Sequence, residues 1–313
     1  IKAAAAADKV VIFAGLPDSF ESEGYDRSHM RLPECQNRLI AEILKVQPNT
    51  VIVLHNGSPV ELPWLNDIKG LLEAYLGGQA GGTAVANILY GKVNPSGKLA
   101  ETMPLKLSDN PSYLNFGGGE KVEYREGVFV GYRYYDTKEM DVAYPFGYGL
   151  SYTTFACSDL KISNENPTDK DTITVSVDVT NTGNMAGKEV VQLYVKDCTS
   201  SAIRPEKELK GFEKVFLNPG ETKAVTMELD KRSFAWYNTE LHDWFAASDE
   251  YKLLVGTSSR DIHLEGRIHL NSSQELPMHV HMNTTLGELF RNPKTSETAK
   301  ELTAKYISAM NVG

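Results

Sequence analysis

Cysteine is scarce in this sequence, and long apolar runs are absent from it. The three cysteines, Cys35, Cys157 and Cys198, are too few and too scattered for a disulfide framework or a zinc site. Their odd number suits a reducing compartment, so a cytoplasmic location is expected. No apolar run approaches the ~20 residues that a membrane-spanning helix needs, and no membrane partner is expected.

Positive charge is also in short supply. The chain has 32 Lys and Arg residues against 41 Asp and Glu residues, which gives a formal net charge of -9. Nucleic acids repel a surface of this sign, whereas neutral sugars are indifferent to it. The hydrophobic content of 41% and the charged content of 23% are those of a globular protein, and 313 residues suffice for two domains.

Apolar runs alternate with helical periodicity in the first half of the chain. Residues 10–14 and 51–54 are continuous in apolar side chains, which is typical of parallel strands covered on both faces. Between them, the apolar residues of 39–46 recur at helical spacing after Pro33. Strands that alternate with helices predict a mostly parallel sheet with right-handed crossovers.

A third apolar segment, residues 70–76, leads into a glycine-rich turn at residues 77–82 and a helix at residues 84–89. Glycines before a helix suggest a dinucleotide site, but the spacing is not Gly-x-Gly-x-x-Gly and no acidic residue follows at the required distance. Tight backbone packing is the interpretation that we prefer, with nucleotide binding as the alternative. No cofactor is therefore expected.

Polar loops follow the first two predicted strands, at the sheet edge where ligands bind in open α/β folds. The first loop contains two carboxylates, Glu23 and Asp26, together with Tyr25 and Arg27, and the second begins at His55. Taken alone, the first loop is typical of a solvated surface turn in which Arg27 pairs with Asp26. Tyr25 and His55 are the side chains that would contact a ligand from this edge, although a lone histidine is more often structural.

From about residue 158 the period of the pattern changes to two. Residues 172–180 alternate strictly, so their odd positions should face a core. An antiparallel sandwich without catalytic residues is predicted. The tail has apolar residues at roughly helical spacing, which predicts one or two short helices docked on a neighbouring domain. The further predicted strands are residues 190–196, 209–216, 223–229, 234–237, 250–255 and 262–270.

Five motifs in a fixed order resemble the C-terminal half of family 3 glycoside hydrolases of the β-glucosidase type. Each motif alone is weak, whereas five in the family's order are a strong signal. They are Ser22-Glu23-Gly24-Tyr25-Asp26-Arg27, Gly57-Ser58-Pro59-Val60, Asn94-Pro95-Ser96-Gly97-Lys98-Leu99, Gly131-Tyr132-Arg133-Tyr134-Tyr135-Asp136 and Tyr144-Pro145-Phe146-Gly147-Tyr148-Gly149-Leu150-Ser151-Tyr152. The resemblance implies a partial α/β-sandwich domain at residues 1–155, a fibronectin type III-like β-sandwich at 156–272 and a helical tail at 273–313.

The resemblance also implies a catalytic role. In this family a (β/α)8 barrel supplies an aspartate nucleophile, and the α/β-sandwich domain lends the general acid/base from a loop. By motif match that acid/base is Glu23, with Asp26 and Arg27 bracing the loop. A retaining glycosidase needs two carboxyl groups about 5 Å apart, one to attack the anomeric carbon and one to protonate the departing oxygen. No metal takes part in this chemistry.

The chain departs from the family pattern in one large respect. No barrel is encoded by these residues, so the nucleophile is expected from a barrel in the same gene product or in a companion chain. The first strand of the sandwich domain is also expected to be missing, since family members often carry an inserted PA14-type module just before the segment that matches residues 8–15. Alone, the chain is expected to hydrolyse nothing measurable.

Several functions remain open at this point. The first is removal of terminal β-linked glucose from an oligosaccharide or glucoside. The second is a β-xylosidase or α-arabinofuranosidase of the same family, since the barrel would grip most of the sugar. The third is a non-catalytic carbohydrate-binding or scaffold protein. Association of several copies of the chain also stays open.

Overall fold

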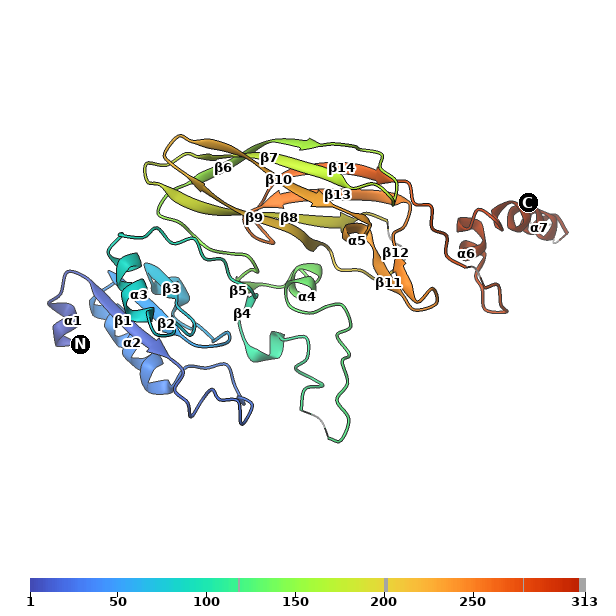
Figure 1. Cartoon of the computed structure of the whole chain (residues 1–313). Coiled ribbons are helices and arrows are strands. Elements are labelled where there is room, and N and C mark those ends of the chain that lie inside the picture. The colour runs from blue at the N-terminus through green and yellow to red at the C-terminus, as the bar shows by residue number, and fades with distance from the viewer. Residues whose placement is uncertain (118, 200–201, 278, 310–313) are drawn as a thin grey trace.

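The structure is a computed structural model, and it describes residues 1–117, 119–199, 202–277 and 279–309. A mixed α/β region at the N-terminal end is followed by an antiparallel β-sandwich and a helical tail (Figure 1). The predicted fold class, α/β followed by all-β, is confirmed. Among the described residues, no helix combines the length and hydropathy that crossing a lipid bilayer requires.

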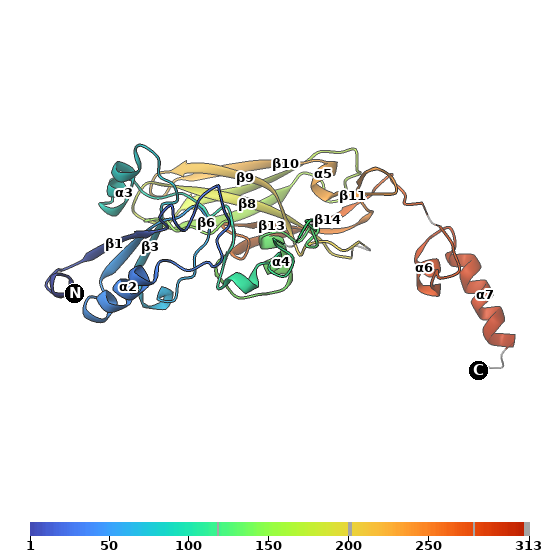
Figure 2. The same ribbon diagram turned by 90° about the horizontal axis from the view of Figure 1, so that it is seen from below.

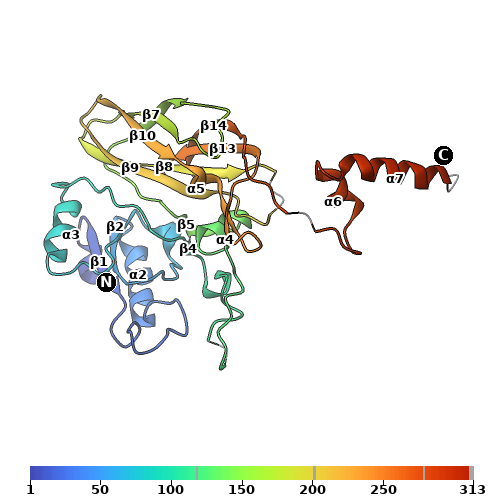
Figure 3. The same ribbon diagram turned by 45° about the vertical axis from the view of Figure 1, so that its right-hand side comes forward.

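The α/β region is built on a three-stranded parallel sheet. Its order is β1-β2-β3, formed by β1 (Val10–Gly15), β2 (Thr50–His55) and β3 (Gly70–Glu73). Helix α2 (Glu34–Val46) covers one face, and α3 (Gly81–Leu89) lies on the other side of the sheet (Figures 1 and 3). Because all three strands run the same way, the loops that follow β1 and β2 meet at one edge.

The core of this region is small and lies between α2 and the sheet. Ile40 of the helix is fully buried with Ile52 and Leu54 of β2, and Ile12 of β1 is 8% exposed. The opposite face of β1 is open, since Phe13 is 62% exposed. Alternation along a strand produces this contrast, because successive side chains point to opposite faces.

The segment between the two domains forms only short elements. Helix α3 begins at Gly81, inside the glycine cluster and three residues earlier than the prediction of a start at residue 84. A long loop then leaves the body of the domain before α4 (Figures 1 and 3). The short elements of the α/β region are α1 (Lys2–Ala5), η1 (Leu65–Asp67), β4 (Met103–Pro104), η2 (Leu107–Asp109), α4 (Tyr132–Thr137) and β5 (Val142–Tyr144).

Two antiparallel sheets form the sandwich, with the strand orders β10-β7-β6 and β14-β13-β8-β9. The odd positions of β7, from Ile173 to Asn181, are all buried, so the predicted alternation is confirmed. They face Leu253 and Ile268 of the other sheet in one continuous core. The strands are β6 (Phe155–Ile162), β7 (Ile173–Asn181), β8 (Gly187–Asp197), β9 (Glu208–Leu217), β10 (Thr222–Leu229), β13 (Asp249–Gly256) and β14 (Ile262–Leu270).

The predicted strand at residues 234–237 is wrong in its first half. Phe234 ends a short helix, α5 (Lys231–Phe234), and the strand β11 covers only Trp236–Asn238. The cause is a helix cap, since the Asp230 side chain accepts a hydrogen bond from the backbone N–H of Ser233. Strand β11 pairs with β12 (Asp243–Phe245), which the sequence pattern did not predict.

Polar contacts with little exposure join the two domains. Lys98 and Glu189 form an ion pair with 2.8 Å between Nζ and Oε1, and their side chains are only 11% and 9% exposed. Gln192 of β8 donates from Nε2 to the carbonyl oxygen of Gly147 at 3.1 Å. Arg260 donates from Nε to Asp136 of α4 at 2.7 Å. The α/β region and the sandwich are therefore fixed against each other.

The tail forms two helices, α6 (Leu286–Arg291) and α7 (Ser296–Ala309). They pack against each other and stand away from both domains (Figures 1 and 2). The predicted helical periodicity is confirmed, but the prediction that these helices dock on a neighbouring domain is wrong for the described residues. Their mutual packing covers Ala299, which is 5% exposed, and leaves Leu302 61% exposed.

Candidate active site at the carboxyl edge of the parallel sheet

Glu23 lies in the loop between β1 and α2, which leaves the parallel sheet at its carboxyl edge. Its side chain is exposed, and within the described part of the chain its carboxyl oxygens take part in no hydrogen bond or ion pair. A carboxyl group that is free on both oxygens can approach a ligand without first breaking an internal contact.

The loop that carries Glu23 is anchored on the loop after β2. Upstream of Glu23, the two carboxylate oxygens of Glu21 accept hydrogen bonds from the backbone N–H of Gly57 and the hydroxyl of Ser58, both at 2.7 Å. Downstream, Arg27 donates from Nη2 to Ser58 Oγ at 2.8 Å and to the carbonyl oxygen of Pro59 at 3.0 Å. Arg27 therefore pairs with the neighbouring loop and not with Asp26.

Tyr25, Asp26 and His55, the other site residues predicted from the sequence, have no part in anchoring the loop. The Tyr25 hydroxyl donates to the carbonyl oxygen of Asp18 within the same loop, and the side chain is 49% exposed. The Asp26 side chain is exposed and contacts no partner in the described residues. The ring of His55 stacks along Phe13, with ring centroids 6.3 Å apart, on the sheet face opposite α2. Glu23 and Tyr25 thus share the loop, whereas His55 belongs to the adjacent strand.

Gly15 makes the close approach of β1 and β2 at this edge possible. It pairs with His55 in the sheet register, and a Cβ atom at position 15 would lie 2.0 Å from the His55 carbonyl oxygen. No side chain fits at that distance, so the strand must end in glycine for the first loop to start here.

A partly buried polar cluster at the same edge of the sheet is formed by Asn56, Glu73, Tyr75 and Glu101. Asn56 is fully buried and donates from Nδ2 to Glu73 Oε2 at 3.4 Å. Glu73 Oε1 accepts from the backbone N–H of Tyr75 at 3.0 Å. The Oδ1 atom of Asn56 is buried without a hydrogen-bond partner among the described residues, which is costly unless a further polar group approaches it.

Burial dominates the electrostatics of this cluster. It raises the pKa of Glu73 to about 7, and the negative charges of Glu101 and Glu21 act in the same direction. Burial also raises the pKa of Glu101, while a hydrogen bond with Tyr75 and the positive charge of Arg27 oppose that shift. Near neutral pH a substantial fraction of Glu73 is therefore protonated.

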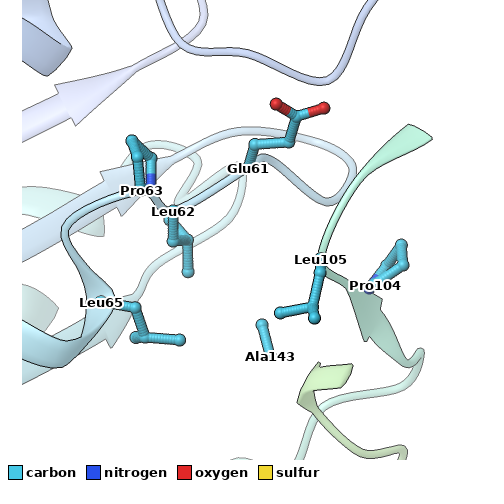
Figure 4. Close-up of a pocket in the computed structure, with 7 residues that line it drawn as sticks. All are labelled: Glu61, Leu62, Pro63, Leu65, Pro104, Leu105 and Ala143. Atoms are coloured by element: carbon cyan, nitrogen blue, oxygen red, sulfur yellow. The ribbon is translucent and has the colours of Figure 1, made fainter. Parts of the chain in front are cut away.

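A second feature of the α/β region is an apolar depression of about 240 Å³, lined by residues that follow β2 and by residues in or next to β4 and β5. In Figure 4 the side chains of Leu62, Leu65 and Leu105 point into it, while the Glu61 carboxylate turns away. Glu61 accepts a hydrogen bond from the backbone N–H of Leu107 at 3.4 Å. This depression has no free polar group pointing into it, so it supplies nothing that could act on a glycosidic bond. Its lining is Glu61, Leu62, Pro63, Leu65, Pro104, Leu105 and Ala143.

Sequence reasoning missed two of the groups at this edge. Glu21 lies directly before the Ser22–Arg27 motif, and only the folded loop shows that its carboxylate reaches the neighbouring loop. Glu73 ends an apolar strand, and a charged residue at that place was a usable signal. In the described residues, no cluster of three or more His, Cys, Asp or Glu side chains could hold a metal ion.

Comparison with known proteins gives matches along the whole chain. Residues 1–152 match the family described as glycosyl hydrolase family 3 C-terminal domain, and residues 189–259 match the fibronectin type III-like domain. A thermostable beta-glucosidase B from Acetivibrio thermocellus is 55% identical over 312 residues, which are 99% of this chain and 41% of that protein. The chain therefore spans less than half the length of this relative.

Two further proteins are similar. An exo-alpha-(1->6)-L-arabinopyranosidase from Bifidobacterium breve is 47% identical over 264 residues, 84% of this chain and 34% of that protein. The crystal structure of a Bifidobacterium adolescentis GH3 beta-glucosidase superimposes with a TM-score of 0.87 at 44% identity, covering 94% of this chain and 44% of that one. The chain thus belongs to family 3 of the glycoside hydrolases and corresponds to the C-terminal half of its β-glucosidase-type members.

Proposed function

We propose that this chain supplies the general acid/base, Glu23, of a retaining exo-β-glycosidase whose nucleophile comes from a barrel outside residues 1–313. One observation carries the proposal. The carboxyl group of Glu23 is exposed and unbonded, yet it lies in a loop that is anchored on both sides at the carboxyl edge of the sheet. A free acid on a fixed loop suits proton transfer to a substrate that binds between two domains.

The reaction takes place in two steps. In the first, a barrel carboxylate attacks the anomeric carbon while Glu23 donates its proton to the departing glycosidic oxygen, which leaves as an alcohol. In the second, Glu23 accepts a proton from water, and the hydroxide attacks the anomeric carbon and releases the barrel carboxylate. The sugar leaves with its configuration retained, and Glu23 is again protonated.

The substrate that we propose is a terminal, non-reducing β-D-glucosyl residue. Support comes from the name of the Acetivibrio thermocellus relative, a beta-glucosidase at 55% identity. A second candidate is a pentose, as in a β-xylosidase or an α-arabinofuranosidase, and the Bifidobacterium breve arabinopyranosidase supports a pentose glycone in general. Initial rates on aryl β-glucoside, aryl β-xyloside and aryl α-L-arabinosides separate the two.

The requirement for a barrel is tested with a chimera. In it, this chain replaces the 312-residue segment that it matches in the Acetivibrio thermocellus protein. The chimera should hydrolyse an aryl β-glucoside, and the 313-residue chain alone should not. Turnover by the isolated chain would contradict the proposal that the nucleophile lies elsewhere.

The role of Glu23 is tested in the same chimera. Replacing Glu23→Ala should lower the rate by ~10²–10⁴ on substrates with poor leaving groups, since these depend on the transferred proton. Azide should partly restore the rate on an activated aryl glucoside and yield the glycosyl azide. A non-catalytic carbohydrate-binding or scaffold role predicts no such loss and no azide product.

A further inference from the structure

Ser58 is the point at which both sides of the Glu23 loop are anchored. The Ser58 hydroxyl donates a hydrogen bond to Glu21 Oε1 at 2.7 Å. Ser58 Oγ also accepts a hydrogen bond from Arg27 Nη2 at 2.8 Å. Donor and acceptor roles are compatible, since a hydroxyl donates once and still accepts on its lone pairs. Glu23 lies between the two anchors, so its backbone is tied to the loop after β2 from either side.

The second oxygen of Glu21 has its own partner. Oε2 accepts from the backbone N–H of Gly57 at 2.7 Å. A Cβ atom at position 57 would lie only 3.1 Å from this carboxylate, so the glycine lets the carboxylate reach the backbone. Both bonds have the short distance of charge-assisted hydrogen bonds, which are about twice as strong as neutral ones.

The loop is also closed internally between its anchors. Ser22 and Tyr25 form an antiparallel bridge, and the backbone N–H of Gly24 donates to Ser22 Oγ at 3.4 Å. The Tyr25 hydroxyl donates back to the Asp18 carbonyl oxygen. With the ends fixed and the turn closed, Glu23 and Asp26 are left as exposed carboxylates of the segment that have no partner among the described residues.

We propose that Glu21 is a positioning residue that sets where the Glu23 carboxyl group stands, through its paired hydrogen bonds to Gly57 and Ser58. The proposal rests on the function proposed above for Glu23. Glu21 is not itself the proton donor, because both of its oxygens already accept hydrogen bonds from the chain. Its effect on the reaction is therefore indirect and is transmitted through Ser22, the one residue that separates it from Glu23.

The leaving group of the substrate determines how strongly a displaced Glu23 carboxyl group should slow the reaction. A general acid must come within hydrogen-bond reach of the departing oxygen, and a displacement of about 1 Å can cost about 100-fold in rate. A leaving group that is stable as an anion needs no proton, so the displacement of Glu23 should not change the rate at which that substrate is hydrolysed. Loss of Glu21 should therefore slow substrates with poor leaving groups selectively, which a general loss of folding would not do.

The experiment compares two glucosides in the active chimera, 2,4-dinitrophenyl β-glucoside and cellobiose. Glu21→Ala should lower kcat/KM for cellobiose about 10- to 100-fold and for the dinitrophenyl glucoside less than about 3-fold. Ser58→Ala should show the same selective loss, and the double variant should lose less than the two single losses combined, since both substitutions remove the bond from Ser58 to Glu21. Glu21→Gln should recover part of the loss, because its amide can accept from Gly57 and donate to Ser58.

Glu34→Gln is the matched control, since it removes an exposed carboxylate at the start of α2, outside the loop, and should leave both rates unchanged. Equal losses on both substrates, or no loss on either, would overturn the positioning role of Glu21. If instead Glu23→Ala shows no leaving-group dependence, the proposed function fails. If Glu21→Ala, and not Glu23→Ala, is rescued by azide, then Glu21 is the proton donor and both proposals are wrong.

Discussion

The side-chain amide of Asn56 donates to Glu73, with 3.4 Å between Nδ2 and Oε2, while Oδ1 of the same amide is buried without a partner. Asn56 begins the loop after β2 and Glu73 ends β3, so the pair belongs to the sheet edge that carries the Glu23 loop. A buried amide with one unpaired oxygen, beside a carboxyl group that titrates near neutral pH, makes the stability of this edge depend on protonation.

Glu73 should make the chain less stable as the pH rises. Burial raises the pKa of Glu73 from 4.5 to about 7, so between these values the folded chain keeps a proton that the unfolded chain has released. The stability that this proton confers is complete below the unfolded pKa and is lost as the pH rises through the folded one. The total is on the order of 3 kcal/mol.

The variant Glu73→Gln tests this dependence, because its amide cannot ionise and can donate to the unpaired Oδ1 of Asn56. Urea unfolding of the 313-residue chain should show the variant more stable than the parent at pH 8, with the difference vanishing at pH 4, below the unfolded pKa. Glu101 shifts in the same direction, so part of the slope remains in the variant. The exposed Glu23→Gln should not reproduce this effect, and parallel curves for Glu73→Gln and the parent would contradict it.

Asp136 should be a costly ion-pair partner to remove. Its side chain is 3% exposed and faces Arg260 at 2.7 Å and Lys207 at 3.2 Å, both from the sandwich. Asp136→Ala leaves two cations at the domain junction without their partner, which should lower the free energy of unfolding by about 3–5 kcal/mol. Thermal unfolding measures it, with Glu42→Ala, which breaks an exposed pair with Lys45, as the control that leaves Tm unchanged.

Gly147 should tolerate no side chain. Its φ of +79° lies in the left-handed region, and a Cβ atom there would stand 2.1 Å from Gln192 Oε1. Gly147→Ala should destabilise the chain by about 2–5 kcal/mol, since backbone strain and the clash add. Gly97→Ala is the matched control, because a Cβ atom at position 97 meets nothing within 4 Å. Equal unfolding midpoints for the two variants would refute the prediction.

The three thiols should differ strongly in reactivity. Cys35 is exposed, whereas burial raises the pKa of the Cys157 thiol to about 11 and raises that of Cys198 as well. The thiolate is the reactive form, so at pH 8 the folded chain should show one fast thiol towards a disulfide reagent. Cys35→Ser should abolish the fast phase, and a fast phase that persists in this variant would contradict the assignment.

The spacing of apolar residues along the sequence predicted most of the strands and helices. The alternation along β7 identified a half-buried strand because one face packs on a core. The apolar runs identified β1 and β2 as strands, but the prediction that both faces are covered is wrong for β1, since Val11 and Phe13 are exposed. The pattern failed at Phe234, where a single capping bond from Asp230 outweighs the strand propensity of an aromatic residue. It also failed for the tail, because periodicity reports an apolar face but not what that face contacts.

Only part of the candidate site could be predicted from the sequence. The motif around Glu23 lies at the predicted edge of the sheet, since a loop that follows a parallel strand must lie there. The anchoring by Glu21 could not be predicted, because it depends on the distance between two loops that are more than thirty residues apart in the sequence. Asp26 and Arg27 have similar sequence signals, yet only Arg27 has the length to reach Ser58.

The ion pair of Lys98 with Glu189 has a consequence for how the chain responds to a protease. Together with the bond from Gln192 to Gly147, it holds the two domains by contacts that do not depend on the connecting backbone. A single proteolytic cut near residue 151 would therefore leave a nicked complex that elutes from a size-exclusion column as one species. The side-chain contacts between the two domains hold them together even when the peptide bond that links them is broken.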